Sequence, residues 1–334
     1  MRISLLLLFA FWGCAVSANT ADQQQRCANE YLLNGDASMT LADVRQACRQ
    51  LQIESLVEVK SIEKIGNISK KFDREKKSAL QPYVLTPHKL NYILPAMMTN
   101  AINKEAYGLF NGYEENLEDI ESKFQLSLKV PLNHQSLFID GDGVYIAFTL
   151  EAWWQIYASG ISKPFRETNY QPEIFYIAPL EWQLFGGNTA FILGLEHQSN
   201  GRGQELSRSW NRFYGHFLFE KGDFALSLKP WVRLSEDEKV SEFDSDGDDN
   251  PDIDDYMGHF ELGMVYTWQD LEFSFKGRKN FQTQYGAAQL SLTFPLWGKL
   301  RGYATGFNGY GESLIDYNYS QSRFGIGVTL NNVL

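Results

Sequence analysis

The chain has 334 residues and a formal net charge of −11, and its basic side chains are seldom clustered. This charge balance argues against nucleic acid as a partner, because binding to a phosphate backbone requires basic patches. Aromatic residues make up 14% of the sequence. Beyond Trp12, no apolar run approaches the ~20 residues that a membrane-spanning helix needs.

Residues 1–18 have the pattern of a secretory signal peptide. Arg2 precedes an apolar run, and small residues follow up to Ala18, where we expect cleavage. A lipoprotein signal at Cys14 is the alternative, but the bulky residues before that cysteine fit it poorly. An exported chain without spanning helices is either periplasmic or a β-barrel, because only helices and closed barrels satisfy the backbone in lipid.

Residues 19–80 differ from the remainder, and we expect them to form a small periplasmic extension. A stretch from Leu41 to Ile53 favours a helix, with Thr40 as its N-cap. Cys27 and Cys48 are expected to form a disulfide in an oxidising compartment, with two free thiols as the alternative.

Residues 81–334 contain many short segments in which apolar and polar residues alternate. A period of 2 places odd and even positions on opposite faces of a strand. We predict an all-β fold, a transmembrane antiparallel β-barrel of about 12 strands. A soluble β-sandwich would show the same alternation, but the signal peptide and the aromatic residues near strand ends favour the barrel. The clearest segments are 124–130, 144–150, 224–228, 260–268, 271–275, 288–294 and 324–330.

Two further segments flank a polar, glycine-rich loop at residues 200–208 and predict an antiparallel hairpin. If the turn is centred near Gln204, His197 lies across from Asn211, and Ser199 lies two residues along on the same face. Cross-strand neighbours have Cβ atoms roughly 4.5–5.5 Å apart. These polar side chains share the face that carries the hairpin's apolar residues.

A hydroxyl, an imidazole and an amide therefore converge. In a hydrolase, Ser199 would be the nucleophile, His197 its general base, and Asn211 the group that orients the base. Because the cluster faces away from any aqueous interior, its substrate would arrive through lipid. The alternative is that His197 and Ser199 are polar residues near the membrane rim.

The stretch from His197 to Arg212 resembles the active-site signature of the outer-membrane phospholipase A family. Similar strings occur at residues 164–170, 249–252 and 309–317, and the resemblance covers about residues 80–334. It implies a calcium-dependent hydrolase of phospholipid and lysophospholipid esters. Such an enzyme would lie in the outer membrane of a Gram-negative type of cell and be active as a homodimer.

The resemblance also implies calcium ligands. Catalytic Ca²⁺ would bind the carbonyl of Arg202 and the hydroxyl of Ser207, with Ser162 contributed by the partner subunit, and oxygen ligands suit this cation. Bound Ca²⁺ would polarise the ester carbonyl. A second calcium ligand, used in the monomer, is expected at Asp249. Its usual acidic companion is Gln204 here, so whether this second site is retained stays open.

The resemblance therefore implies a phospholipase with Ca²⁺ as cofactor. At the expected dimer interface Leu150 replaces a glutamine of the family, which indicates apolar packing. Two alternatives remain: a passive barrel, either a porin or a structural protein, and a lipid A deacylase, which also uses a Ser–His pair on a barrel's outer surface. The sequence does not fix positional or head-group preference.

Overall fold

The computed structural model describes residues 27, 29, 40–50, 66, 69, 86–108, 110–133, 135–241, 244 and 247–331. The signal peptide expected at residues 1–18 and most of the extension expected at 19–80 lie outside the described residues. The chain divides into two compact units, Met1–Lys64 and Ile65–Leu334. None of the helices that the described ranges contain is long and apolar enough to cross a membrane.

In the first unit, residues 41–50 are helical. The helix is capped at Thr40, whose backbone N–H donates to the Asp43 carboxylate at 2.8 Å, while the Asp43 N–H donates to the Thr40 hydroxyl at 3.4 Å. This reciprocal pair is a capping box, which satisfies N–H groups that the first turn leaves unpaired. Cys27 and Cys48 form a disulfide.

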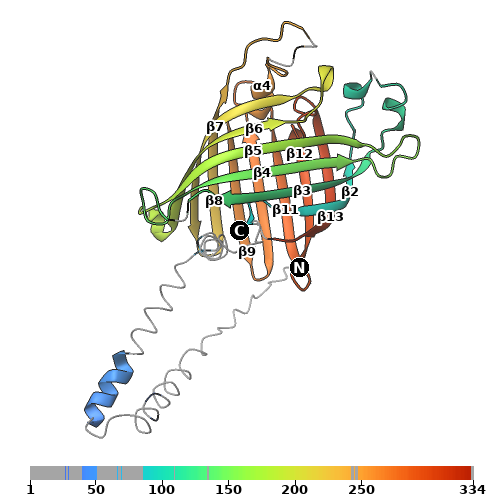
Figure 1. Ribbon diagram of the computed structural model, residues 1–334. Helices are drawn as coiled ribbons and strands as arrows, with labels where there is room; N and C mark the ends of the chain where they lie inside the picture. The colour runs from blue at the N-terminus through green and yellow to red at the C-terminus, as the bar shows by residue number, and fades with distance from the viewer. Residues whose placement is uncertain are drawn as a thin grey trace, which may run out of the picture. The chain divides into compact units, whose positions relative to one another are not determined.

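The second unit is an antiparallel barrel (Figure 1). Twelve of the thirteen strands found in its described residues close the ring, since each pairs with the next in sequence and the last pairs back with the first. The predicted barrel of about 12 strands is therefore confirmed. The ring consists of β2 (Tyr92–Thr99), β3 (Ile120–Pro131), β4 (Gly143–Trp154), β5 (Phe165–Leu180), β6 (Asn188–Ser199), β7 (Ser209–Lys221), β8 (Phe224–Leu234), β9 (Phe260–Trp268), β10 (Leu271–Lys279), β11 (Gly286–Trp297), β12 (Leu300–Tyr310) and β13 (Ser320–Thr329).

The first strand of the ring is irregular. The short β1 (Thr86–Pro87) pairs with β3, and β2 continues along the same neighbour after a gap. The register of β2 shifts between Leu94 and Met97, where the chain contains Pro95. Proline has no N–H to donate to a ladder, so it is tolerated at a bulge. Strand β2 thus continues past this proline to Thr99.

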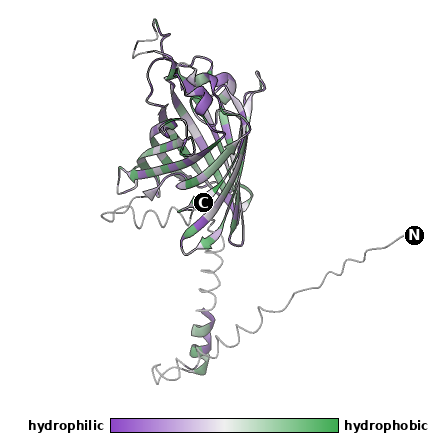
Figure 2. Cartoon of the chain, turned by 90° about the vertical axis from the view of Figure 1, so that its right-hand side faces the viewer, coloured by the Kyte–Doolittle hydropathy of each residue, from purple (hydrophilic) through white to green (hydrophobic). Residues whose placement is uncertain are grey.

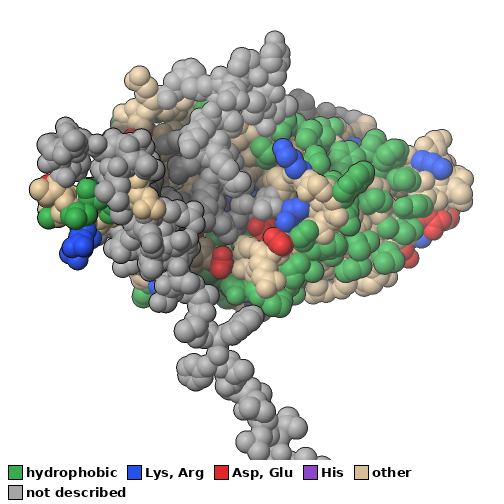
Figure 3. Space-filling model, turned by 90° about the horizontal axis from the view of Figure 1, so that it is seen from below, with side chains coloured by type: hydrophobic (Ala, Val, Ile, Leu, Met, Phe, Trp, Pro, Cys, Tyr) green, Lys and Arg blue, Asp and Glu red, His purple; other side chains and the backbone are tan. Residues whose placement is uncertain are grey.

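The barrel wall has mostly apolar side chains outside, while its charged side chains lie inside together with a buried apolar cluster. Figure 2 shows hydrophobic and hydrophilic residues alternating along the strands, and Figure 3 shows an outer wall covered mostly by hydrophobic side chains. This arrangement inverts that of a soluble β-sandwich and is typical of a membrane-spanning barrel. Outward apolar residues include Leu126, Ile146, Ile174, Leu195, Phe213, Leu228, Phe273, Leu290 and Ile326; buried polar residues include Glu121, Arg166, Glu173, Glu196, Arg212, Glu272 and Arg323.

The two ends of the barrel differ. One end has two-residue turns at 222–223, 269–270 and 298–299, of which the first and last contain glycines with positive φ. The opposite end carries longer connections at 100–119, 155–164, 200–208, 235–259 and 311–319, and we call it the long-loop end. The helix α4 (Ile253–Met257) lies there (Figure 1). The hairpin loop at 200–208 therefore belongs to the long-loop end.

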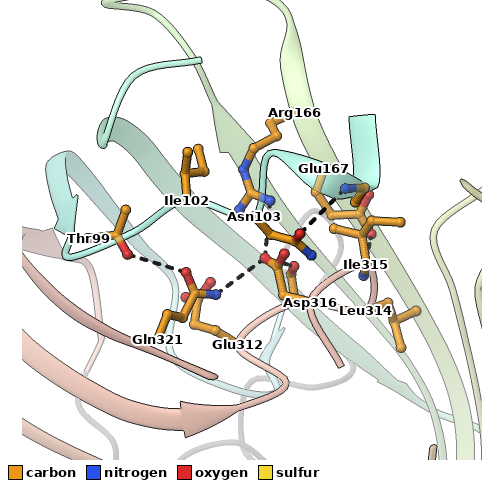
Figure 4. Close-up of polar contacts among 12 residues, drawn as sticks. Thr99, Ile102, Asn103, Arg166, Glu167, Glu312, Leu314, Ile315, Asp316 and Gln321 are labelled. Carbon is orange, nitrogen blue, oxygen red and sulfur yellow. Dashed lines mark hydrogen bonds and ion pairs between the residues drawn. The ribbon is translucent and has the colours of Figure 1, made fainter. Parts of the chain in front are cut away.

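Buried charges fasten the 311–319 loop inside the long-loop end (Figure 4). Arg166 of β5 contacts Glu121 of β3 at 3.0 Å and Asp316 of this loop at 3.1 Å. Arg323 of β13 contacts the same Glu121, and also Glu312 at 2.9 Å. Buried charges are costly unless paired, so these contacts fix the loop against β3, β5 and β13.

Candidate active site

The hairpin β6–β7 has the register that the sequence predicts. His197 lies opposite Asn211, and Ser199 lies opposite Ser209. The atoms His197 Nδ1 and Asn211 Oδ1 are 2.8 Å apart. Because an amide oxygen can only accept, Nδ1 of His197 carries the proton and donates it. The other ring nitrogen, Nε2, is therefore left as the basic one.

These side chains lie on the outer face of the barrel. Leu193 and Leu195 are 39% and 49% exposed, whereas Ile192 and Glu196 are buried. Because strand side chains alternate, His197 and Ser199 continue the outward row. Both side chains are half-buried. The site therefore faces the surroundings of the barrel and not its interior.

The Ser199 hydroxyl and Nε2 of His197 belong to the same outward row. Of the hydrogen bonds within the described residues, none joins these two groups. In enzymes without substrate such contacts are often long, and they shorten in the complex. The fold places Ser199 and His197 on the same face of β6, and the hydrogen bond to Asn211 fixes the orientation of the histidine ring.

The loop that follows Ser199 is organised by the buried Asn200. Its side-chain oxygen accepts the backbone N–H of Arg202 at 3.2 Å and that of Arg208 at 3.0 Å. Its amide nitrogen donates to the carbonyl of Leu206 at 2.7 Å. Gly201 has a φ of +63°, a conformation that favours glycine. The backbone next to the serine is thus held in one conformation.

Two of the expected calcium ligands lie in contact. The Ser207 hydroxyl donates to Asp249 Oδ2 at 2.6 Å. The 235–259 connection, which carries Asp249, is held against β7 because the Ser209 N–H donates to the buried Asn250 side chain at 3.0 Å. The other Asp249 oxygen forms an ion pair with Lys239. The 200–208 loop and the 235–259 connection therefore meet beside the hairpin.

The two remaining expected ligands, Arg202 and Ser162, lie on two different loops, at 200–208 and 155–164. Arg202 extends its guanidinium to the carbonyls of Phe165 and Arg166, at 2.9 and 3.0 Å, which fixes this residue near the start of β5. Ser162 is exposed on the loop between β4 and β5. Its expected role involves a second subunit, so it stays a prediction.

Among the described residues, no three His, Cys, Asp or Glu side chains gather into a metal-binding group. The donors present are instead a hydroxyl, a carboxylate and the backbone carbonyls of the 200–208 loop. All are oxygen atoms, and calcium prefers oxygen ligands. The chemistry of the donor set therefore fits Ca²⁺.

The structure adds one residue that the sequence analysis did not single out. The amide nitrogen of Asn211 donates to Glu236 Oε1 at 2.6 Å. Asn211 pairs with Leu234, the last residue of β8, and Glu236 follows two positions later. Continuing the outward parity of β8 by one more step places Glu236 on the same face, but parity alone does not give its contact with Asn211. The acidic composition of the loop concealed it among many similar side chains.

The closed barrel and the outward His197–Asn211 pair define the class of protein: a membrane β-barrel with a candidate hydrolase site on its outer face. The Phospholipase A1 family model matches residues 68–330. Phospholipase A1 of Escherichia coli (strain K12) is 38% identical over 253 residues, which cover 75% of this chain and 83% of that relative. The chain therefore belongs to the phospholipase A1 family, a family of enzymes.

Solved structures agree with this assignment. Outer membrane phospholipase A from Escherichia coli has a TM-score of 0.72 at 36% identity, covering 81% of this chain and 99% of that one. The Salmonella typhi outer membrane phospholipase dimer with bound calcium has a TM-score of 0.70 at 37% identity, covering 78% of this chain and 98% of that one. The shared fold extends over almost the whole length of both relatives.

Proposed function

We propose that this chain is an outer-membrane phospholipase that hydrolyses acyl esters of glycerophospholipids and lysophospholipids by a Ser-His-Asn mechanism. The observation that carries the proposal is the hydrogen bond between His197 and Asn211 on the lipid-facing side of the hairpin, with Ser199 on the same face. A substrate acyl ester in the outer leaflet reaches this face without leaving the membrane.

In the first step His197 Nε2 accepts the proton of the Ser199 hydroxyl while Ser199 Oγ attacks the ester carbonyl carbon. The ester C–O bond then breaks, and the imidazolium gives its proton to the departing alcohol oxygen. Water hydrolyses the resulting acyl-serine by the same two proton transfers. Asn211 Oδ1 accepts a hydrogen bond from Nδ1–H of His197 and so maintains the tautomer that leaves Nε2 basic before the attack.

Calcium would be held by the carbonyl of Arg202 and by the hydroxyl of Ser207, with Ser162 of the partner subunit. When bound there, it would stabilise negative charge on the substrate carbonyl oxygen. The contact between Ser207 and Asp249 supports an oxygen-rich site next to the hairpin. The relative from Salmonella typhi, a dimer with bound calcium, supports the same proposal. A site completed by two subunits would keep the monomer inactive in its own substrate.

The decisive experiment replaces Ser199 by alanine in the full chain and measures fatty acid release from mixed micelles of phospholipid and detergent with calcium. Loss of the nucleophile should reduce kcat by a factor of roughly 10⁴ to 10⁶. Ser320→Ala, an exposed serine at the start of β13, is the matched control and should retain full activity. Both variants should keep the heat-resistant gel mobility of a folded barrel.

Wild-type turnover in Ser199→Ala would rule out this mechanism. Acyl release from lipopolysaccharide but not from glycerophospholipid would instead identify a lipid A deacylase. Membership of a family of enzymes favours hydrolysis over the passive barrel.

A further inference from the structure

Two adjacent strands of the barrel and the connection after a third contribute one polar side chain each to a continuous row. His197 comes from β6, Asn211 comes from β7, and Glu236 follows the end of β8. His197 Nδ1 lies 2.8 Å from Asn211 Oδ1, and Asn211 Nδ2 lies 2.6 Å from Glu236 Oε1. The row thus begins at the base and ends at a carboxylate.

The contact with Glu236 decides which edge of the Asn211 amide faces the histidine. A carboxylate can only accept, so the NH₂ group of the amide must point toward Glu236. The amide oxygen then points toward His197 and requires a proton on Nδ1. If the amide were flipped, its NH₂ group would face Nδ1, the proton would move to Nε2, and the histidine could not act as a base toward Ser199.

The carboxylate also supplies charge that the amide lacks. A neutral amide stabilises an imidazolium less well than a carboxylate does. In a chain of hydrogen bonds each group polarises the next, so a negative charge on Glu236 increases the partial charge on Asn211 Oδ1. The stabilisation matters most when His197 has taken the proton from Ser199, which is when the positive charge exists.

We propose that Glu236 is a positioning residue of the hydrolytic site, acting on His197 through Asn211. This inference rests on the proposed function. Glu236 touches neither the nucleophile nor the base, and its effect is transmitted by one amide. The site is accordingly a row of four side chains, Ser199, His197, Asn211 and Glu236.

The test compares Glu236→Ala and Glu236→Gln in the full-length protein with calcium and micellar phospholipid. Alanine removes both orientation and charge, and kcat should fall by about 10- to 100-fold, the range for a hydrogen bond to a charged group, while KM stays close to that of the wild type. Glutamine retains an acceptor oxygen for Asn211 Nδ2 but removes the charge, so its loss of kcat should be smaller. The exposed Asp237 has a side chain without a hydrogen bond in the described structure, and Asp237→Asn is the matched control with wild-type kcat.

A double-mutant cycle separates this role from general stabilisation of the fold. In an Asn211→Ala background, Glu236→Ala should cause no further loss of kcat, because its only route to His197 has been removed. An equal loss in both backgrounds, or wild-type kcat in Glu236→Ala, overturns the proposal. Ser199→Ala is assayed in parallel. If that variant is inactive while Glu236→Ala is normal, only the role of Glu236 fails; if it is active, the proposed function itself fails.

Discussion

At the scale of single residues, the hydrogen bonds of the candidate site are directed by side chains that can only accept or only donate. Ser207 donates to Asp249 because the carboxylate has no proton to give, and Lys239 can only act as a cation. Lys239 occupies one Asp249 oxygen with a positive charge that is tethered to the chain. The resemblance implies an acidic companion for Asp249, and this chain has Gln204 at that position. A divalent cation at Asp249 would therefore meet fewer negative charges. It would also have to displace the Lys239 ammonium group.

We therefore predict that Lys239→Met increases the calcium affinity of the protein. Methionine keeps the length of the side chain but frees the Asp249 oxygen. The Kd for calcium should fall about 2- to 5-fold, because a partly exposed ion pair contributes about 0.5–1 kcal/mol. Calcium titration calorimetry of the protein in detergent measures it. Lys299→Met removes the same charge from an exposed turn at the opposite end and should leave Kd unchanged; an equal gain in both variants would mean that only net charge matters.

At the scale of elements, the hairpin β6–β7 was predictable because two local rules fix it. Alternation assigns His197 and Asn211 to the outer face, and the loop length fixes the register that sets them opposite each other. The contacts of Glu236 and Lys239 were not predictable. Both lie in the 235–259 connection, which has no periodicity, and their partners Asn211 and Asp249 are decided by how that loop folds back on β7. The bulge at Pro95 falls between these cases, because a proline favours an interruption of the ladder but does not show whether the strand continues beyond it.

A carboxylate also organises the turn at the opposite end of the barrel. Asp142 is buried between β3 and β4, where it accepts the backbone N–H groups of Leu137, Phe138 and Ile139 at 2.6–2.9 Å. The Tyr176 hydroxyl donates to it at 2.8 Å. Burial alone would raise the pKa of Asp142, but these four donors together lower it to about 2 from an ordinary value of 3.8.

We predict that Asp142→Asn lowers the Tm of the barrel in detergent at pH 5 and at pH 7 by the same amount. The folded pKa lies below the unfolded one, so the ionised carboxyl stabilises the fold fully above about pH 4 and loses this effect as the pH falls toward 2. The difference in Tm between variant and wild type should shrink over that window. Asp140→Asn in the same exposed turn is the control. A difference that persists unchanged at pH 2 would show that shape, not charge, explains the defect.

At the scale of the whole molecule, the barrel places its charges inside and its apolar side chains outside, so any partner that binds the wall must do so through apolar contacts. Leu150 of β4 lies on the outward row with Phe148, which is 45% exposed, and it pairs with Leu126 of β3 and Tyr170 of β5. These side chains form an apolar surface on the strands that adjoin the loop carrying Ser162. The proposed homodimer needs a contact that brings this loop to the active site of a second copy.

Leu150→Ala should therefore weaken dimerisation without damaging the barrel. Shortening one side chain removes van der Waals contacts, which drive association in lipid because burial there gains no hydrophobic energy. We expect the dimer dissociation constant to rise about 2- to 5-fold, as measured by sedimentation in detergent with calcium, and the activity lost at low protein concentration to return at high concentration. Leu290→Ala, an equal deletion on the outer face of β11 across the ring, should change neither quantity. If the two variants dimerise equally well, the subunits meet on another part of the wall, and Ser162 would then have no route to the second site.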